Sequence, residues 1–380
     1  MKTRKPFHMN GLTKSVLCVS IFLIGTVDGV YARTKAVTLD AARAQTEDGP
    51  FLYVANQEAA AITVIDLSTH TVAEIIDLEK MGYGANAKPH HLVVEPDGSF
   101  WYVSLIAANQ ILKFNRNNEL VASVEFERPG LLALHPIENW LFVGRSMAAV
   151  NPPQRIGRID RTSMEIEEFD VFIPRPHALS TTPNGAWIFT GSLGENSIVS
   201  IEVESGQVEL LRLPGSQRQP HVIVQYAVSP DGKTLVATAE MTAKLLVFDV
   251  SDPSNPELKH EISVGARPWH PSWSHDGRWI WFGNLGANEV TLIDTQDWSV
   301  ADVVSGNGLA EPHGSALSAD GSRLYVANRN ERGTYSSKDQ LGYGAPGGTV
   351  VVIDTATRNI IDVIETPPYA AGVGLASNPR

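Results

Sequence analysis

The residues with the clearest potential for chemistry are histidines that recur at one position of a repeated pattern. Six of the 11 histidines in this 380-residue chain lie just after a proline, where an apolar segment begins. They are His90, His91, His177, His221, His270 and His313. Neutral imidazole is the side chain best suited to hold copper, zinc or iron near neutral pH when no thiolate is present. Four or more of them, if brought together, would form a metal or metal-cofactor site.

Cationic residues lie one position before several of the same prolines. They are Lys88, Arg128, Arg175 and Arg267, and the pattern is broken by Gln219 and Glu311. Four cations around one opening would attract a small anion or a carboxylate-rich cofactor. The alternative is that each cation pairs with an acidic residue of the neighbouring repeat.

The elements that must position these residues are encoded as an internal repeat. Turn signals occur at Asp48, Asp97, Asn184, Asp231, Asp276 and Asp320, each followed by glycine, and Glu138-Asn139 fills the one wide gap. Asp-Gly and Asn-Gly suit two-residue hairpins, because both central residues need positive φ. An apolar strand follows each turn, and a second one ends in a pair such as Ile65-Asp66 or Ile353-Asp354. Tryptophans in the strands after the turns, such as Trp101, are expected to pack between repeats.

The two ends of the repeat complement each other. The last proline-led strand, 368–377, has no turn after it, and the turn at 48–49 has no such strand before it. We therefore predict an all-β fold: a single seven-bladed β-propeller of four-stranded blades over residues 47–380. The C-terminal strand joins the N-terminal blade and closes the ring, which leaves few exposed strand edges. The proline-led strands would be innermost, so the histidines and cations would meet at one channel mouth.

The N-terminal segment has the pattern of a secretory signal. Residues 1–32 carry a basic lead, an apolar stretch at 15–27 and small residues near Ala32, and 33–46 reads as an extension. The apolar stretch is shorter than the ~20 residues of a membrane-spanning helix. We expect a periplasmic or secreted protein without a membrane span after cleavage. The sole cysteine, Cys18, would be removed with the signal, which excludes disulfides and thiolate ligands.

The charge of the chain argues against a nucleic-acid partner. The full chain carries 30 Lys and Arg against 42 Asp and Glu, a net charge of −12. Without residues 1–32 the balance becomes 26 against 41, or −15. Such a surface repels a polyanion.

Three strings carry a resemblance to a known repeat family: FLYVAN at 51–56, LYVAN at 324–328 and VVVID at 350–354. They resemble the YVTN-type propeller repeat, over nearly all of residues 47–380. The resemblance implies the propeller fold. It leaves function open, because that family includes binding proteins, lactonase-like enzymes and metal or haem oxidoreductases.

The His90-His91 pair, with single histidines from other blades, is similar to the copper-site propellers of nitrous oxide reductases and thiocyanate dehydrogenases. This resemblance implies that all six channel histidines are metal ligands. The departures are the missing cupredoxin domain, the missing cysteines and Gly130 in place of a histidine in the third repeat. Because neighbouring strand residues point to opposite sides, a regular strand would send only one of His90 and His91 into the channel. The haem d1 domains of cytochrome cd1-type proteins are the second resemblance.

Three further residues are candidate channel contacts. Glu240 follows the position where other repeats have asparagine, and it could be a carboxylate at the mouth. Tyr83 and Tyr343 lie in two copies of the string GYGA, at 82–85 and 342–345. The second copy belongs to a long connection, 329–348, which we expect to fold over the mouth as a lid. The alternative is that both copies are surface loops.

The sequence thus favours an exported metal or metallocofactor protein, with copper first and a haem d1-like group second. It would be a redox protein that acts on a small anion, with a redox partner protein. The alternative is a non-catalytic propeller that binds a protein or cofactor partner and holds no metal. A lactonase-like hydrolase ranks last, because the channel is rich in histidine and poor in carboxylate.

Overall fold

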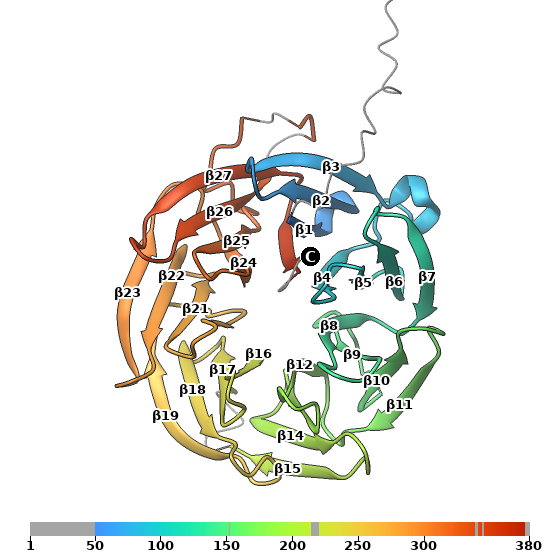
Figure 1. Ribbon diagram of the computed structural model, residues 1–380, viewed down its shortest axis with the longest axis vertical. Helices are drawn as coiled ribbons and strands as arrows, with labels where there is room; N and C mark the ends of the chain where they lie inside the picture. Colours follow the sequence, from blue (N-terminus) through green and yellow to red (C-terminus); the bar gives the residue numbers. More distant parts are fainter. Residues whose placement is uncertain (1–49, 152, 214–219, 339–340, 344–345, 377–380) are drawn as a thin grey trace, which may run out of the picture. The chain divides into compact units, whose positions relative to one another are not determined.

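The computed structural model describes residues 50–151, 153–213, 220–338, 341–343 and 346–376. In these ranges seven four-stranded antiparallel sheets stand as blades around a central channel (Figure 1). The predicted seven-bladed propeller is confirmed. The predicted signal peptide and N-terminal extension lie outside the described residues. No helix of the described ranges is long and apolar enough to span a bilayer.

Each blade is named here by its number and given from the innermost strand outwards. Blades 1 to 4 consist of β28 (Ala370–Leu375), β1 (Phe51–Asn56), β2 (Ala61–Asp66) and β3 (Thr71–Asp77); β4 (Pro89–Val94), β5 (Phe100–Leu105), β6 (Gln110–Asn115) and β7 (Leu120–Glu125); β8 (Pro129–Leu134), β9 (Trp140–Arg145), β10 (Arg155–Asp160) and β11 (Ile166–Asp170); β12 (Pro176–Thr181), β13 (Trp187–Ser192), β14 (Ser197–Glu202) and β15 (Val208–Arg212).

Blades 5 to 7 follow the same order. They consist of β16 (Ile223–Val228), β17 (Thr234–Ala239), β18 (Lys244–Asp249) and β19 (Glu257–Ser263); β20 (Ser272–Trp273), β21 (Trp279–Asn284), β22 (Glu289–Asp294) and β23 (Ser299–Ser305); β24 (Pro312–Leu317), β25 (Arg323–Asn328), β26 (Gly348–Asp354) and β27 (Ile360–Thr366). A short 3-10 helix, Gln57–Ala59, and a π-helical turn, Glu79–Tyr83, lie in connections of the first blade.

The glycine turns within the described residues join the innermost strand of a blade to the next strand, as expected, but their type differs from the prediction. The first predicted turn, at 48–49, lies outside the described residues. In blade 2 the N–H of Gly98 donates to the carbonyl of Glu95 at 2.8 Å, so glycine is the last residue of a four-residue turn. The Asp97 carboxylate accepts the N–H of Ser99 at 3.0 Å. Aspartate therefore stabilises the turn through its side chain, and glycine supplies only one positive φ, +69°.

Ring closure follows the predicted route. Strand β28 pairs antiparallel with β1, with Tyr53 opposite Gly374 and Val54 opposite Val373. Beyond the strands, the N–H of Gln57 donates to the carbonyl of Tyr369 at 2.9 Å. The two ends of the propeller are thus joined by the same hydrogen-bond ladder that holds each blade together.

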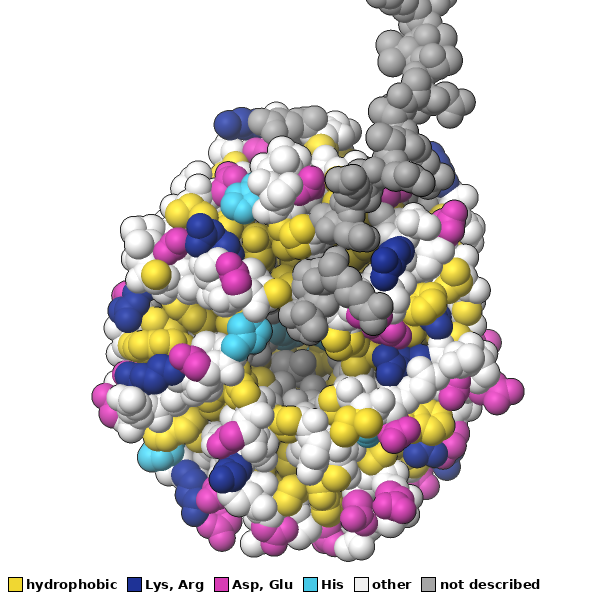
Figure 2. Space-filling view, in the orientation of Figure 1, with side chains coloured by type: hydrophobic (Ala, Val, Ile, Leu, Met, Phe, Trp, Pro, Cys, Tyr) yellow, Lys and Arg dark blue, Asp and Glu magenta, His cyan; other side chains and the backbone are white. Residues whose placement is uncertain are grey.

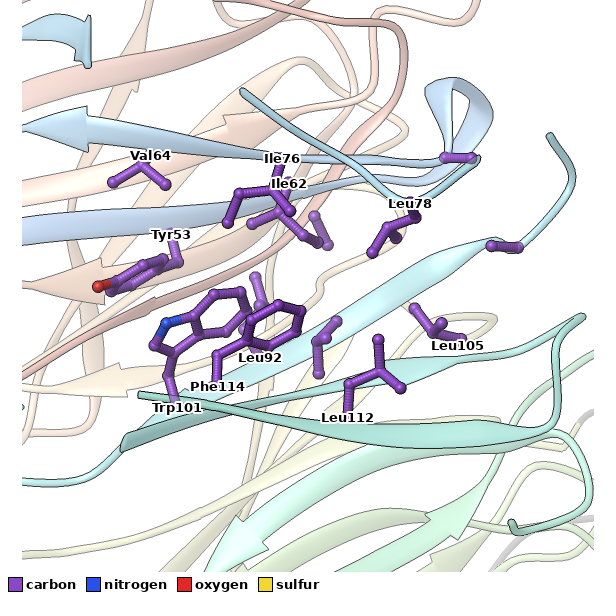
Figure 3. Packing of buried hydrophobic residues seen from close by; sticks show 14 of the residues in the cluster. Tyr53, Ile62, Val64, Ile76, Leu78, Leu92, Trp101, Leu105, Leu112 and Phe114 are labelled. Atoms are coloured by element: carbon purple, nitrogen blue, oxygen red, sulfur yellow. The ribbon is translucent and has the colours of Figure 1, made fainter. Parts of the chain in front are cut away.

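Large side chains from the middle strands fill the spaces between blades, as predicted for the tryptophans. Trp101 of blade 2 is fully buried and stacks on Tyr53 of blade 1, with ring centroids 4.6 Å apart. Its other neighbour is Phe114, at 4.1 Å and nearly parallel. Figure 3 shows these rings within the apolar cluster between the two blades. Such packing fixes the angle between neighbouring blades.

The closing strand makes a testable close approach. A Cβ added at Gly372 would lie 2.4 Å from the carbonyl oxygen of His90 and 2.8 Å from Cα of His91. We expect Gly372→Ala to lower the free energy of unfolding by about 2 kcal/mol, because the backbone must move apart. Gly194→Ala is the matched control, since its nearest neighbour would be 3.7 Å away. Denaturant unfolding of the two variants measures the difference, and equal stabilities would contradict this account of closure.

Candidate functional site

The entry of each inner strand into the channel depends on an unusual backbone conformation before the proline. Lys88, Arg128, Arg175, Arg267 and Glu311 all have left-handed backbones, with φ between 47° and 59°. Their carbonyls accept an N–H from just beyond the second strand, as Arg128 does from Ser146 at 2.8 Å. This sharp turn aims the residues after the proline at the propeller axis. The repeated local geometry is what brings the histidines together.

Five histidines meet in the channel, and we call them the channel histidine cluster: His90, His91, His177, His270 and His313. Their ring centroids lie 6.2 Å apart for His90–His177, 5.5 Å for His90–His313, 5.6 Å for His91–His270 and 5.0 Å for His270–His313. All five side chains are buried. Figure 2 shows histidine side chains beside the central opening on one face of the molecule. Four blades therefore contribute imidazoles to one compact group.

The sixth predicted histidine stands apart. His221 is buried, but no ring contact joins it to the cluster within the described residues. Its Nδ1 lies 2.8 Å from the Thr242 hydroxyl, and its backbone N–H donates to Asn196. Blade 3 contributes no histidine for a steric reason. A Cβ at Gly130 would lie 2.6 Å from the Arg145 carbonyl oxygen, which leaves no room for a side chain.

His177 is held in the tautomer that a metal ligand needs. Its Nδ1 lies 2.7 Å from the Arg145 carbonyl oxygen, which can only accept, so Nδ1 carries the proton. The lone pair is therefore on Nε2. That atom is buried and has no hydrogen-bond partner in the described part of the chain. Histidines that bind metals commonly donate their other N–H to a backbone carbonyl in this way.

The adjacent residues His90 and His91 differ in their hydrogen bonds. The backbone N–H of Leu132 donates to Nδ1 of His91 at 3.2 Å, so the neutral His91 ring carries its proton on Nε2. Neither nitrogen of His91 then offers a free lone pair. His90 contacts the Gln57 amide oxygen through Nδ1, at 3.1 Å, and this leaves Nε2 for a ligand. Both rings reach the cluster, although we expected a regular strand to direct only one inward; β4 is irregular here, with a register shift between Pro89 and Leu92.

The sequence interpretation missed Trp269 as a member of this group. It occupies the position directly after the proline, where other blades have histidine, and its ring lies 4.2 Å from that of His313. Three buried nitrogens here lack partners among the described residues: Nε1 of Trp269, Nε2 of His270 and Nδ1 of His313. The order Pro-Trp-His at 268–270 could have indicated this role, because it places Trp269 at the position where other blades have histidine.

Burial keeps the cluster uncharged. Loss of hydration lowers the pKa of His91 to about 3 and that of His177 to about 4. The pKa values of His90, His270 and His313 are also far below the ordinary histidine value, first through burial and then through neighbouring imidazoles. The charge of Arg329, another residue that the sequence did not indicate, lowers the pKa of His90 and His313 further. At neutral pH these rings are therefore uncharged.

Of the four cations before the prolines, two form ion pairs with carboxylates of the described residues and two do not. Lys88 pairs with Glu58, and Arg267 lies 2.6 Å from Glu240, in each case a carboxylate of the preceding blade. Arg128 and Arg175 form no ion pair with a described residue. A continuous positive ring is therefore absent from the described residues, and two cations remain available to a ligand.

Among the described residues, no ring contact joins either tyrosine to the cluster. Tyr83 packs against the apolar core between blades 1 and 2. Burial, and then the charge of Asp77, raises the pKa of Tyr343. Part of the 329–348 connection extends past β27 in Figure 1, where Tyr335 donates to Glu365 at 3.1 Å. The connection begins at the mouth, where the N–H of Arg332 donates to the Glu311 carboxylate at 3.0 Å, so the expected lid stays a prediction. Glu240 is buried and accepts a hydrogen bond from Arg267, so its role in the structure is that of an ion-pair partner.

The cluster as it stands limits how a metal can bind. Within the described ranges, no group of three or more His, Asp or Glu side chains is arranged to hold an ion. A site that uses several imidazoles therefore requires some rings to rotate. A cofactor that brings its own equatorial ligands needs only one or two of these nitrogens.

Comparison with known proteins supports the fold and adds one functional lead. No protein-family model matches the chain, so the expected repeat family stays a prediction. A segment of 138 residues is 28% identical to a dihydro-heme d1 dehydrogenase of Pseudomonas aeruginosa; it covers 34% of this chain and 26% of that protein's length.

Two solved structures share the architecture. The dihydro-heme d1 dehydrogenase NirN in complex with DHE superposes with a TM-score of 0.60 and 14% identity, over 87% of this chain and 76% of that one. Hydrazine synthase of Kuenenia stuttgartiensis superposes with a TM-score of 0.59 and 18% identity, over 76% of this chain and 90% of that one. At these identities the likeness concerns the fold alone.

The buried neutral histidines predict acid sensitivity of metal-free protein. In the unfolded chain a histidine titrates near pH 6.5, whereas His91 and His177 do so at about 3 and about 4 when folded. Below pH ~6.5 the unfolded state binds more protons than the folded state, so the free energy of unfolding falls as the pH falls. The loss is about 1.4 kcal/mol per pH unit for each histidine that is protonated only in the unfolded state. Denaturant unfolding between pH 7 and 4.5 measures the slope.

His177→Gln should reduce that slope, whereas His275→Gln, at an exposed turn, should leave it unchanged. The same slope in all three proteins would show that the cluster does not govern the acid response.

Proposed function

We propose that this propeller is an exported redox protein that binds a metal centre through the channel histidine cluster. The observation that carries the proposal is His177: its Nδ1–H is fixed by the Arg145 carbonyl, and its buried Nε2 lone pair has no partner among the described residues. Such a lone pair is costly to bury and gains most from a metal. The N-terminal pattern at 1–32 supports export.

A haem d1-type group is the first candidate for that centre. Such a group would need only one protein nitrogen for its iron, and Nε2 of His177 or of His90 could hold it. Arg128 and Arg175, which lack ion pairs with described residues, suit the carboxylates of such a cofactor. The local similarity to a dihydro-heme d1 dehydrogenase supports this choice. Bound there, the group would supply one-electron redox chemistry to a small anion.

Copper ions are the second candidate, and the number of imidazoles favours them. Five neutral rings in mutual contact, without thiolate, form a donor set that copper accepts. Each ion would need two or more lone pairs directed at one point. That requires some of these rings to turn, and His91 to break its contact with Leu132 if it is to ligate.

Purification from a periplasmic fraction tests the proposal. We expect about one equivalent of iron with a haem absorption band; copper without such a band would select the second candidate. His177→Ala should lower the affinity for the centre by roughly 10- to 100-fold, since it removes an oriented ligand. His275→Ala is the matched control. Protein free of both metals, with unfolding that ignores added copper and haem, would overturn the proposal in favour of a metal-free binding scaffold.

A further inference from the structure

The part of the cluster around His313 contains hydrogen-bond donors that no metal can satisfy. Trp269 is almost fully buried, and its indole Nε1–H lacks a partner among the described residues. The Nε–H of Arg329 is also buried without a partner there. Indole and guanidinium nitrogens donate only and cannot ligate a metal. A metal at the histidines would leave both of these groups unsatisfied.

Trp269 and Arg329 share a neighbour, His313. The Trp269 ring lies 4.2 Å from that of His313, and Val224 and Leu285 pack around the indole. The backbone N–H of Arg329 donates to the Glu311 carbonyl at 3.1 Å, so Arg329 starts beside the strand that carries His313. Its guanidinium stacks on Tyr369, 4.2 Å from the ring centroid, and its Nη2 donates to the Glu331 carboxylate. The indole is fixed by its packing, and the guanidinium by its stacking contact.

Unpaired buried donors are uncommon in proteins, and each costs about 1–3 kcal/mol. Two obligate donors need a partner with acceptor atoms at more than one position. The guanidinium also pairs with Glu331 through Nη2, and its free Nε–H favours an anionic acceptor. Nε2 of His270 and Nδ1 of His313, the other unpaired nitrogens, can each donate or ligate. A neutral apolar ligand would satisfy none of the four atoms.

We propose that Trp269 and Arg329 form an anion-binding subsite beside the channel histidine cluster, which takes a small anion with acceptor atoms at two or more positions. This rests on the proposed function and specifies its substrate class, since the anion would lie next to the metal-binding imidazoles. Trp269 donates its indole N–H to one acceptor atom, and Arg329 donates its Nε–H to a second. The two residues bind and orient the anion and take no part in holding the metal.

Trp269→Phe is the sharpest variant, because it keeps an aromatic ring against His313 and removes only the donor. The probe is azide, a compact anion with acceptor atoms at both ends. Titration calorimetry of the protein as purified should show azide affinity reduced about tenfold or more in Trp269→Phe and in Arg329→Gln, as for a lost hydrogen bond to a charged group. Metal content should be unchanged in Trp269→Phe.

Trp298→Phe is the matched control. This tryptophan stacks on His260 at the outer strand, 5.5 Å between centroids, and should bind azide like the unmodified protein. A second readout is independent of folding losses in the variants. The indole N–H resonance of ¹⁵N-labelled Trp269, assigned by its disappearance in Trp269→Phe, should shift when azide is added.

The outcomes separate this subsite from the proposed function. Metal-containing protein that binds azide equally well with and without the Trp269 indole, or whose Trp269 resonance ignores azide, overturns the subsite and leaves the metal proposal standing. Metal-free protein whose Trp269 resonance shifts with azide supports the subsite and removes the metal proposal.

Discussion

The pairing of β28 with β1 is the constraint on which the channel depends. Without it the seven blades would form an open arc, and the inner strands would not face a common axis. The joint also lies within the candidate site. Gly372 of β28 packs against the backbone of His90 and His91. Gln57, whose N–H bonds the Tyr369 carbonyl across the joint, contacts the His90 ring with its side chain. The contacts that close the ring therefore also help to position His90 and His91.

The repeat predicted the fold because each repeat carries its own turn, strands and packing residues. The position of the histidines in the channel followed from their place after the prolines. Their individual roles did not follow, because they depend on partners distant in sequence. Leu132, 41 residues away, makes His91 a hydrogen-bond acceptor at Nδ1, and the Arg145 carbonyl fixes the His177 tautomer. The course of the long connection depends on distant partners in the same way: Tyr335 donates to Glu365, 30 residues further along the chain.

The cluster is energetically unfavourable for the protein alone. Five imidazoles are removed from water, and unpaired nitrogens remain on His177, His270 and His313. Each unsatisfied buried polar atom costs about 1–3 kcal/mol, a sizeable part of the ~5–15 kcal/mol that stabilises a typical domain. The rest of the propeller compensates through packing such as the Trp101 stack. Ordinary core packing gives no reason to gather polar rings at the one point where all blades meet, whereas ligand binding does.

The two candidate centres can be ranked by the number of histidine lone pairs that each of them needs. A haem-type iron needs a single lone pair, and His177 presents one with its proton already placed on the opposite nitrogen. A copper cluster needs several lone pairs to converge, and no three donors among the described residues do so. Recruiting His91 would also leave the buried Leu132 N–H without its acceptor, a loss of about 1–3 kcal/mol before any metal bond forms. The number of imidazoles favours copper, but their hydrogen bonds favour a centre that uses few of them and leaves the remaining rings to surround it.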